Sequence, residues 1–147
     1  MKKIENKVIS ISGTNNKLKI KFLLLLIKKN KKNILIINMD YFIEELLIKN
    51  INKINRKIDF INCKEIIQKN KNIKEYINNL KNKFELIIIN TSYECFFDYN
   101  KKLIKNSNKN YFLISNDLIE IKKASYLLKM YKNNWKISNK KIKIIVN

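Results

Sequence analysis

The 147-residue chain has 46% hydrophobic residues, enough apolar material for one globular domain over residues 1–147, and this composition excludes an intrinsically disordered chain. Its formal net charge of +20 favours association with nucleic acid or another anionic surface. Of the 32 cationic residues, however, only Arg56 is an arginine, and specific recognition of phosphates and bases favours arginine. We therefore expect a solvated, lysine-rich surface and retain non-specific nucleic-acid association as an alternative.

Apolar runs and cysteines indicate the location of the protein. The longest uninterrupted apolar run, Phe22–Ile27, is far too short to span a bilayer, and the charged N-terminus lacks the pattern of a secretory signal. Cys63 and Cys95 lie far apart in a chain without His, so the sequence spells out neither a zinc site nor a redox pair. We expect a cytoplasmic protein with reduced thiols and no transmembrane segment.

Short apolar runs alternate with helical patterns along the whole chain. Predicted strands cover residues 8–12, 34–37, 57–61, 85–89, 111–114 and 142–146. The first predicted helix follows a turn at 13–16, and further helices are predicted at 41–53, at 64–81 and after Asp117, which is expected to cap the last one. A loop or short helix is expected before residue 104. Residues at helical spacing are Leu18, Phe22, Leu25, Leu26 and Lys29 in the first helix, and Leu118, Ile121, Ala124, Leu127, Leu128 and Tyr131 in the last. We predict an α/β protein with a three-layer, mostly parallel, doubly wound sheet and helices on both faces.

Polar residues follow several predicted strands, at the edge where such sheets bind ligands. Residues 7–14, Lys-Val-Ile-Ser-Ile-Ser-Gly-Thr, resemble the first strand of the MinD/ParA-type P-loop ATPases, which leads into a glycine-rich loop ending in Gly-Lys-Thr. Residues 32–40 resemble that family's second strand, which ends in Asp-x-Asp, and residues 84–92 resemble its Walker B strand. Residues 108–147 follow the family's order of strand, turn, helix and strand. The resemblance covers nearly the whole chain and implies a P-loop NTPase-like fold.

The phosphate loop departs from the family pattern. A P-loop needs glycines that let backbone N–H groups cradle phosphates, a Lys that reaches them, and a Ser or Thr hydroxyl for Mg²⁺. Of the residues in this pattern, the chain retains only one glycine, Gly13. A loop of family length places Ile20–Phe22 at the Lys-Thr-Thr positions, whereas a register set by the helix places Asn15–Lys17 there. Neither register restores the motif, and the family's signature second lysine falls on Asn15.

The acidic positions of the family are altered as well. Asn38 replaces the first Asp of the Asp-x-Asp pair, Asn90 replaces the Walker B Asp, and Asp40 is retained. An amide cannot act as a base, and one carboxylate without the loop hydroxyl makes a poor Mg²⁺ site. Asn147 aligns with the family's adenine-contacting Asn, where the chain stops. The sequence therefore resembles a degenerate, C-terminally truncated member of the family.

The resemblance and its departures together imply a non-catalytic pseudo-ATPase that acts as a protein-binding or scaffolding module, as a homodimer or with a partner protein. Three alternatives stay open: an atypical ATP-binding protein or ATPase with a degenerate P-loop, a non-specific basic nucleic-acid-associated protein, and a gene product without retained activity. We assign no catalytic residue, metal ligand or cofactor, with ATP and Mg²⁺ as the alternative. The residues that would contact a nucleotide are Gly13, Thr14, Asn15, Asn16, Lys17, Lys19, Lys21, Asp40, Asn90 and Asn147.

Each candidate also has a purely structural explanation. Residues 13–21 form either a reduced anion site at a helix N-terminus or a plain strand-to-helix turn. The polar residues at 38, 40 and 90 either belong to a nucleotide site or cap strand ends. The aromatic residues within 96–99 form a partner surface or pack against the sheet, and Trp135 is expected to anchor the loop before the last strand. Cys95, between two acidic residues and without a His, is not expected to be a nucleophile.

Overall fold

The computed structural model describes residues 7–30, 33–68 and 72–147. Its six strands are β1 (Lys7–Gly13), β2 (Ile34–Asn38), β3 (Asp59–Asn62), β4 (Leu86–Asn90), β5 (Lys109–Ile114) and β6 (Ile142–Val146). Its helices are α1 (Asn16–Lys29), the 3-10 turn η1 (Tyr41–Ile43), α2 (Glu44–Asn52), α3 (Cys63–Gln68), α4 (Ile73–Lys81), α5 (Phe97–Lys105), α6 (Leu118–Lys129) and the π-helical turn η2 (Met130–Asn134). The strands form one sheet in the order β3-β2-β4-β1-β5-β6, and all neighbours are parallel. The predicted α/β class is confirmed.

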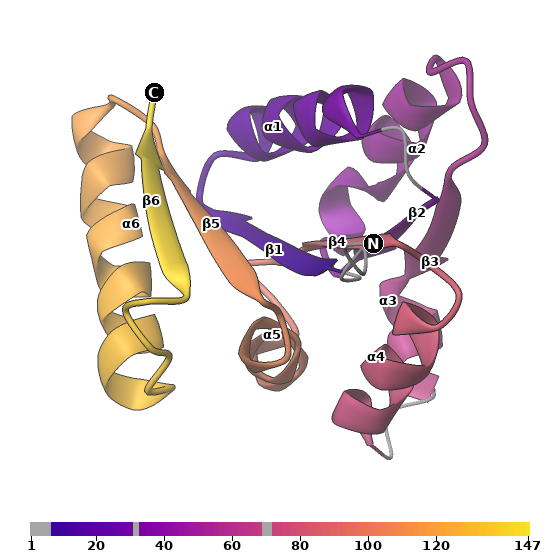
Figure 1. Cartoon of the computed structure of the whole chain (residues 1–147). Coiled ribbons are helices and arrows are strands. Elements are labelled where there is room, and N and C mark those ends of the chain that lie inside the picture. Colours follow the sequence, from indigo (N-terminus) through magenta and orange to yellow (C-terminus); the bar gives the residue numbers. More distant parts are fainter. Residues whose placement is uncertain (1–6, 31–32, 69–71) are drawn as a thin grey trace, which may run out of the picture.

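Helices cover both faces of the sheet (Figure 1). On one face α1 and α2 pack against the strands through aliphatic residues such as Leu23 and Leu47. On the other face α3 and α4 pack through Ile66 and Ile77, and α6 covers β5 through Leu127. Every residue of β2 and β4 is buried, as expected for parallel strands that helices cover on both sides. The result is the three-layer arrangement predicted from the sequence.

The buried face of α1 differs from the predicted one. Leu25, which falls at the predicted helical spacing, is 46% exposed. Four consecutive leucines fill more than one side of this helix, so the sequence allows several phases, and packing against the sheet selects one of them. The buried residues of α1 are Lys19, Ile20, Leu23 and Ile27.

Other elements also differ from expectation. The helix predicted over 64–81 is described as α3 and α4, and residues 69–71 lie outside the described residues. The second of these helices has its own N-cap, Asn72, whose side chain accepts a hydrogen bond from the Glu75 N–H. Asp117 caps α6 as predicted, but Leu118 is 79% exposed and does not belong to the buried face. Trp135 is buried, as predicted, and stacks on the ring of Tyr131 with centroids 4.8 Å apart.

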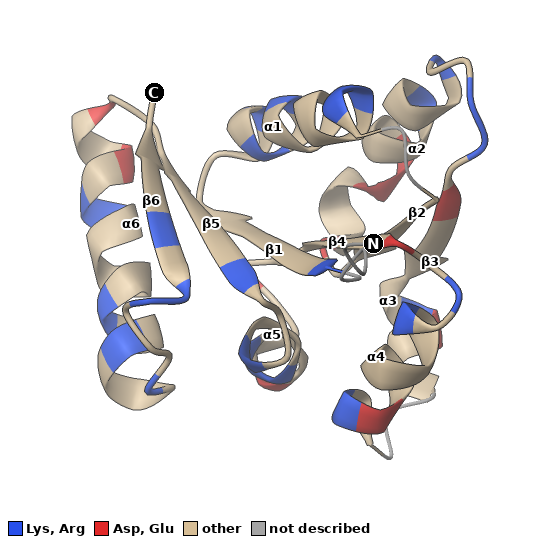
Figure 2. Cartoon of the chain, in the orientation of Figure 1, with Lys and Arg blue, Asp and Glu red and all other residues tan. Residues whose placement is uncertain are grey.

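Lysine and arginine positions are spread over the helices, the loops and strands such as β5 and β6 (Figure 2). The one arginine, Arg56, donates hydrogen bonds from Nη1 to the carbonyl oxygens of Ile27 and Asn30 at the end of α1. That guanidinium is therefore used to hold the chain after α2 against α1. Within the described ranges every helix falls short of the length or the apolar character that crossing a bilayer requires.

Candidate functional site

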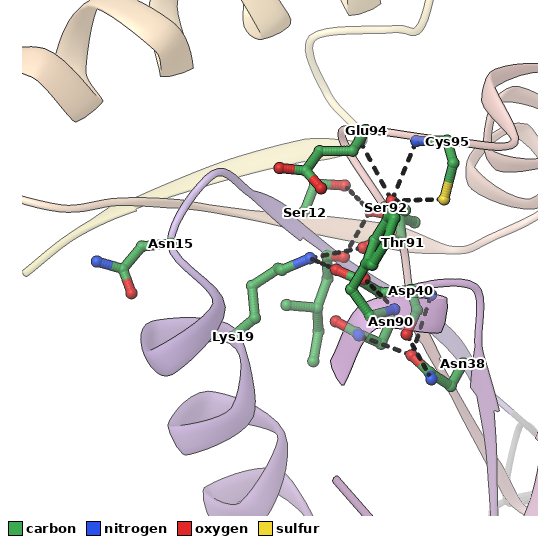
Figure 3. Close-up of polar contacts among 12 residues, drawn as sticks. Ser12, Asn15, Lys19, Asn38, Asp40, Asn90, Thr91, Ser92, Glu94 and Cys95 are labelled. Carbon is green, nitrogen blue, oxygen red and sulfur yellow. Dashed lines mark hydrogen bonds and ion pairs between the residues drawn. The ribbon is translucent and has the colours of Figure 1, made fainter. Parts of the chain in front are cut away.

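Lys19 lies at the centre of the site, at the carboxyl ends of the strands (Figure 3). Its side chain is fully buried, and its ammonium Nζ donates to the carbonyl oxygen of Thr91, 2.7 Å away. The same Nζ lies 3.4 Å from Oδ2 of Asp40, whose side chain is 4% exposed. Burial lowers the pKa of Lys19 below its ordinary value of 10.5, and the Asp40 carboxylate opposes this shift. The site therefore contains a buried ion pair that joins α1 to the ends of β2 and β4.

The local structure of α1 explains how Lys19 reaches this position. The N-cap, Asn15, is extended, and its side-chain oxygen accepts from the Leu18 N–H at 3.0 Å. The backbone carbonyl of Asn15 accepts from the Lys19 N–H at 3.1 Å. The helix thus begins three residues after Gly13, and the segment that would wrap around a phosphate in a P-loop is helical instead. These bonds already occupy two of the N–H groups that such a loop would offer.

Asn38 and Asn90 form a buried amide pair beside this ion pair. They lie opposite each other in the ladder between β2 and β4, and Asn90 Nδ2 donates to Asn38 Oδ1 at 2.9 Å. Asn38 also accepts from the Asp40 N–H at 3.1 Å and donates to the Asp40 carbonyl at 3.0 Å. The other carboxylate oxygen of Asp40, Oδ1, caps η1 by accepting a hydrogen bond from the Phe42 N–H. The amide groups therefore stabilise the strand ends in the way the structural explanation predicts.

Sequence reasoning missed the polar floor of the site. Ser12 Oγ lies 2.9 Å from Thr91 Oγ1 and accepts hydrogen bonds from Asn110 Nδ2 and from the Tyr131 hydroxyl, each at 2.9 Å. Burial raises the pKa of Tyr131 to about 12. A chain of hydrogen bonds thus connects η2, across β1, to the residue that holds Lys19. The available signal was a pair of serines, at 10 and 12, on the buried side of an otherwise apolar strand.

The loop after β4 closes one side of the site. Ser92 Oγ accepts from the N–H groups of Glu94 and Cys95, and it lies 3.3 Å from the Cys95 thiol. A hydrogen bond with Glu94 raises the pKa of the Tyr93 hydroxyl to about 12. Phe96 has a left-handed φ of 56° and precedes α5. Both cysteines are free thiols, as expected.

The structure brings some predicted residues together and separates others. Lys19, Asp40 and Asn90 meet at the strand ends (Figure 3). Gly13 ends the neighbouring strand β1, two residues beyond Ile11, the partner of Asn90, and Thr14 follows it. The remaining predicted residues lie elsewhere. Asn15 donates to Glu120 Oε2 at 2.9 Å, and Asn16 follows it as the first residue of α1. Lys17 is exposed, and Lys21 and Asn147 line a separate groove beside β6. Of the aromatic residues within 96–99, Phe96 and Tyr99 pack against the core on the face of the sheet that α3 and α4 cover, whereas Phe97 is 43% exposed.

Lys19 lies at the sequence spacing of the lysine in the P-loop pattern. In Gly-x-x-x-x-Gly-Lys-[Ser/Thr] the lysine follows the first glycine by six residues. From Gly13 this spacing gives Lys19, with Leu18 at the second glycine and Ile20 at the Ser/Thr position. Neither register expected from the sequence matches this geometry, since both place the lysine position elsewhere. The lysine of the pattern is present, and its neighbours are replaced.

These residues do not fit a Mg²⁺–nucleotide group. Ile20 has no hydroxyl, the amide of Asn90 is bonded to Asn38, and the carboxylate of Asp40 is paired with an ammonium. Among the described residues no group of three or more His, Cys, Asp and Glu residues could hold a metal ion. A buried ammonium group therefore lies 3.4 Å from Asp40, the carboxylate that the motif retains.

Comparison with known proteins supports the fold and goes no further. No family model and no curated protein matches the sequence. Among solved structures, a ParA family ATPase from Chlorobium tepidum matches 97% of this chain and 74% of its own, with 14% identity and a TM-score of 0.63. MinD from Aquifex aeolicus matches 96% of this chain and 69% of its own, with 16% identity and a TM-score of 0.60. The kinase domain of the Escherichia coli tyrosine kinase ETK matches 99% of this chain and 69% of its own, with 14% identity and a TM-score of 0.61. The chain thus has the fold of the ParA/MinD type of P-loop proteins.

Proposed function

We propose that this protein is a non-catalytic, MinD/ParA-like pseudo-ATPase that acts as a protein-binding or scaffolding module. The observation that carries this proposal is the closed contact of Lys19 with Thr91 and Asp40. A lysine that binds phosphate must offer its ammonium to the ligand, whereas here Thr91 and Asp40 hold this group and the side chain is fully buried. The chain keeps the ParA/MinD-type fold, and on this proposal its outer surface binds a protein.

Nucleotide titration tests the absence of catalysis. We expect no phosphate release from ATP with Mg²⁺, and no heat from Mg²⁺-dependent binding of ATP or ADP in isothermal titration at physiological salt. Magnesium-dependent turnover that Lys19→Met abolishes and Lys28→Met leaves intact would contradict the proposal. Lys28 is the matched control because it is an exposed lysine at the far end of the same helix.

A metal-free nucleotide or phosphate binder is the second candidate, because Lys19 occupies the lysine position of the P-loop pattern. Binding would require the ammonium to leave Thr91 and Asp40. This candidate predicts ATP binding in the presence of EDTA that Lys19→Met weakens at least tenfold and Lys28→Met does not change. Equal weakening by both variants would instead indicate attraction of a polyanion to a chain of charge +20.

The partner and the location remain part of the proposal. We propose a cytoplasmic protein that binds a partner protein or a second copy of itself. Non-specific nucleic-acid binding is the competing explanation of the charge, and it predicts affinity that falls steeply with salt and does not depend on sequence. Analytical ultracentrifugation at several salt concentrations separates these cases, because self-association of a chain with charge +20 should strengthen as salt screens the repulsion.

A further inference from the structure

Strand β6 forms one edge of the sheet (Figure 1). It pairs with β5 alone among the described residues. The Lys141 carbonyl accepts from the Asn110 N–H at 2.8 Å, and the Asn147 N–H donates to the Ile114 carbonyl at 3.0 Å. In a parallel ladder, the N–H and C=O of one residue face the same neighbour and alternate along the strand. The backbone of Ile142, Ile144 and Val146 therefore faces away from β5 and is available to another strand.

The side chains around this edge are apolar on both faces of the sheet. Ile144 and Val146 are 44% and 66% exposed, although β-branched residues of this size are usually covered in a sheet. On the α1 face a groove of about 250 Å³ runs beside β6, and Phe22, Leu25 and Ile145 contribute to its lining. A strand added to β6 would extend the ladder and cover Ile144 and Val146 on one face. Its side chains on the other face would lie at the edge of the groove, beside Lys143 and Lys21.

The charged residues near β6 indicate which kind of segment would pair with this strand. Lys143 is the only charged residue of β6, and Lys21 lines the groove. A second copy of the chain also carries a net charge of +20 and would bring its own Lys143 to the edge, so the two copies repel each other. The favoured occupant therefore carries acidic residues.

We propose that the open edge of β6 binds an extended segment of a partner protein in which acidic residues alternate with aliphatic ones. The partner strand continues the sheet beyond β6, its aliphatic side chains cover Ile144 and Val146, and its carboxylates meet Lys143. This inference rests on the protein-binding part of the proposed function and names its surface and the chemistry of its ligand. It does not depend on whether a nucleotide binds.

The test uses a fluorescein-labelled peptide of nine residues in which Glu alternates with Val. We expect saturable binding in fluorescence anisotropy, and at least tenfold weaker binding of the same peptide with alternate backbone nitrogens methylated, because methylation removes the ladder donors. Hydrogen exchange followed by NMR should show new protection of the N–H groups of Ile142, Ile144 and Val146. The N–H groups of Lys143 and Ile145 face β5 and should keep their protection.

Two substitutions of exposed residues complete the test. Val146→Lys should weaken peptide binding at least tenfold, whereas the matched control Ile119→Lys, at a 68% exposed position on α6, should leave it unchanged. Equal binding of the methylated peptide, protection outside β6, or no binding at millimolar peptide would each overturn the inference. Dimers of the free protein with the same protection pattern would overturn it in favour of a second copy. A failure here leaves the nucleotide titrations unaffected, so it is distinct from a failure of the proposed absence of catalysis.

Discussion

Replacing Lys19 by Met removes a buried charge from the centre of the molecule while keeping a side chain of similar length. The substitution leaves the Thr91 carbonyl without its donor and leaves the Asp40 carboxylate, 4% exposed, without its cation. Removing one partner of a buried ion pair costs about 3–5 kcal/mol, because the other charge stays desolvated. The total stability of a domain is about 5–15 kcal/mol, so we expect Lys19→Met to remove a large part of it.

Urea unfolding at pH 7, followed by far-UV circular dichroism and by the fluorescence of Trp135, measures this loss. The matched control is Lys21→Met, an exposed lysine of the same helix, for which we expect a change within about 0.5 kcal/mol. The double variant Lys19→Met/Asp40→Asn removes both charges, and an Asn at position 40 can still accept from the Phe42 N–H. We expect the double variant to be about 2 kcal/mol more stable than Lys19→Met alone.

Two results would refute this reasoning. A loss below about 1 kcal/mol for Lys19→Met would mean that the ion pair and the bond to Thr91 contribute little beyond their desolvation. A double variant as unstable as the sum of the single variants would mean that Lys19 and Asp40 do not interact in solution.

Three further predictions concern the floor of the site and the strand ends. Burial raises the pKa of Tyr131 to about 12, so the contribution of its protonated hydroxyl to folding stability is fully present below pH 10 and is lost as the pH rises toward 12. Tyr131→Phe should remove this loss, which is roughly 3 kcal/mol of urea stability between pH 10 and 12. Gly13→Ala should lower the free energy of unfolding by about 1–3 kcal/mol, because φ is +147° and the new Cβ would lie 2.6 Å from the Leu113 carbonyl oxygen. Asn90→Asp should cost about 1–3 kcal/mol, since it replaces the donor to Asn38 by an acceptor.

Each of these predictions has its own control. Tyr126→Phe, at a 76% exposed position, should leave the pH dependence as it is, and an equal effect of both Tyr variants would remove the argument from burial. A Gly13→Ala protein with unchanged melting temperature would show that β1 and β5 can separate without cost at this point. A gain in the stability of Asn90→Asp with added Mg²⁺, absent in the unsubstituted protein, would show that the altered strand end still binds a metal.

Much of the fold could be predicted because it depends on short-range patterns. Ile-rich runs such as 34–37 and 86–89 are apolar on both faces, as expected for a strand between two helical layers. The N-cap at Asp117 was predictable because a short polar side chain before an apolar run satisfies the first N–H groups of a helix. The clustering of Asn38, Asp40 and Asn90 was predictable because the carboxyl ends of parallel strands meet at one edge.

Other features could not be predicted because they depend on contacts between distant parts of the chain. The leucines of α1 are compatible with several helical phases, so the sequence did not indicate that Lys19 faces inward and Leu25 outward. The hydrogen bond from Tyr131 to Ser12 joins residues 119 positions apart. No local pattern reports such a pairing.

By itself the sequence determined the α/β class, the succession of strands and helices, and the loss of the hydroxyl and carboxylate groups of the P-loop pattern, because residue type and periodicity carry that information. The tertiary structure alone decided that Lys19 is held by Thr91 and Asp40, and that the backbone of β6 is open on one side. The physical reason is that both features arise where strand ends and strand edges from different parts of the chain come together.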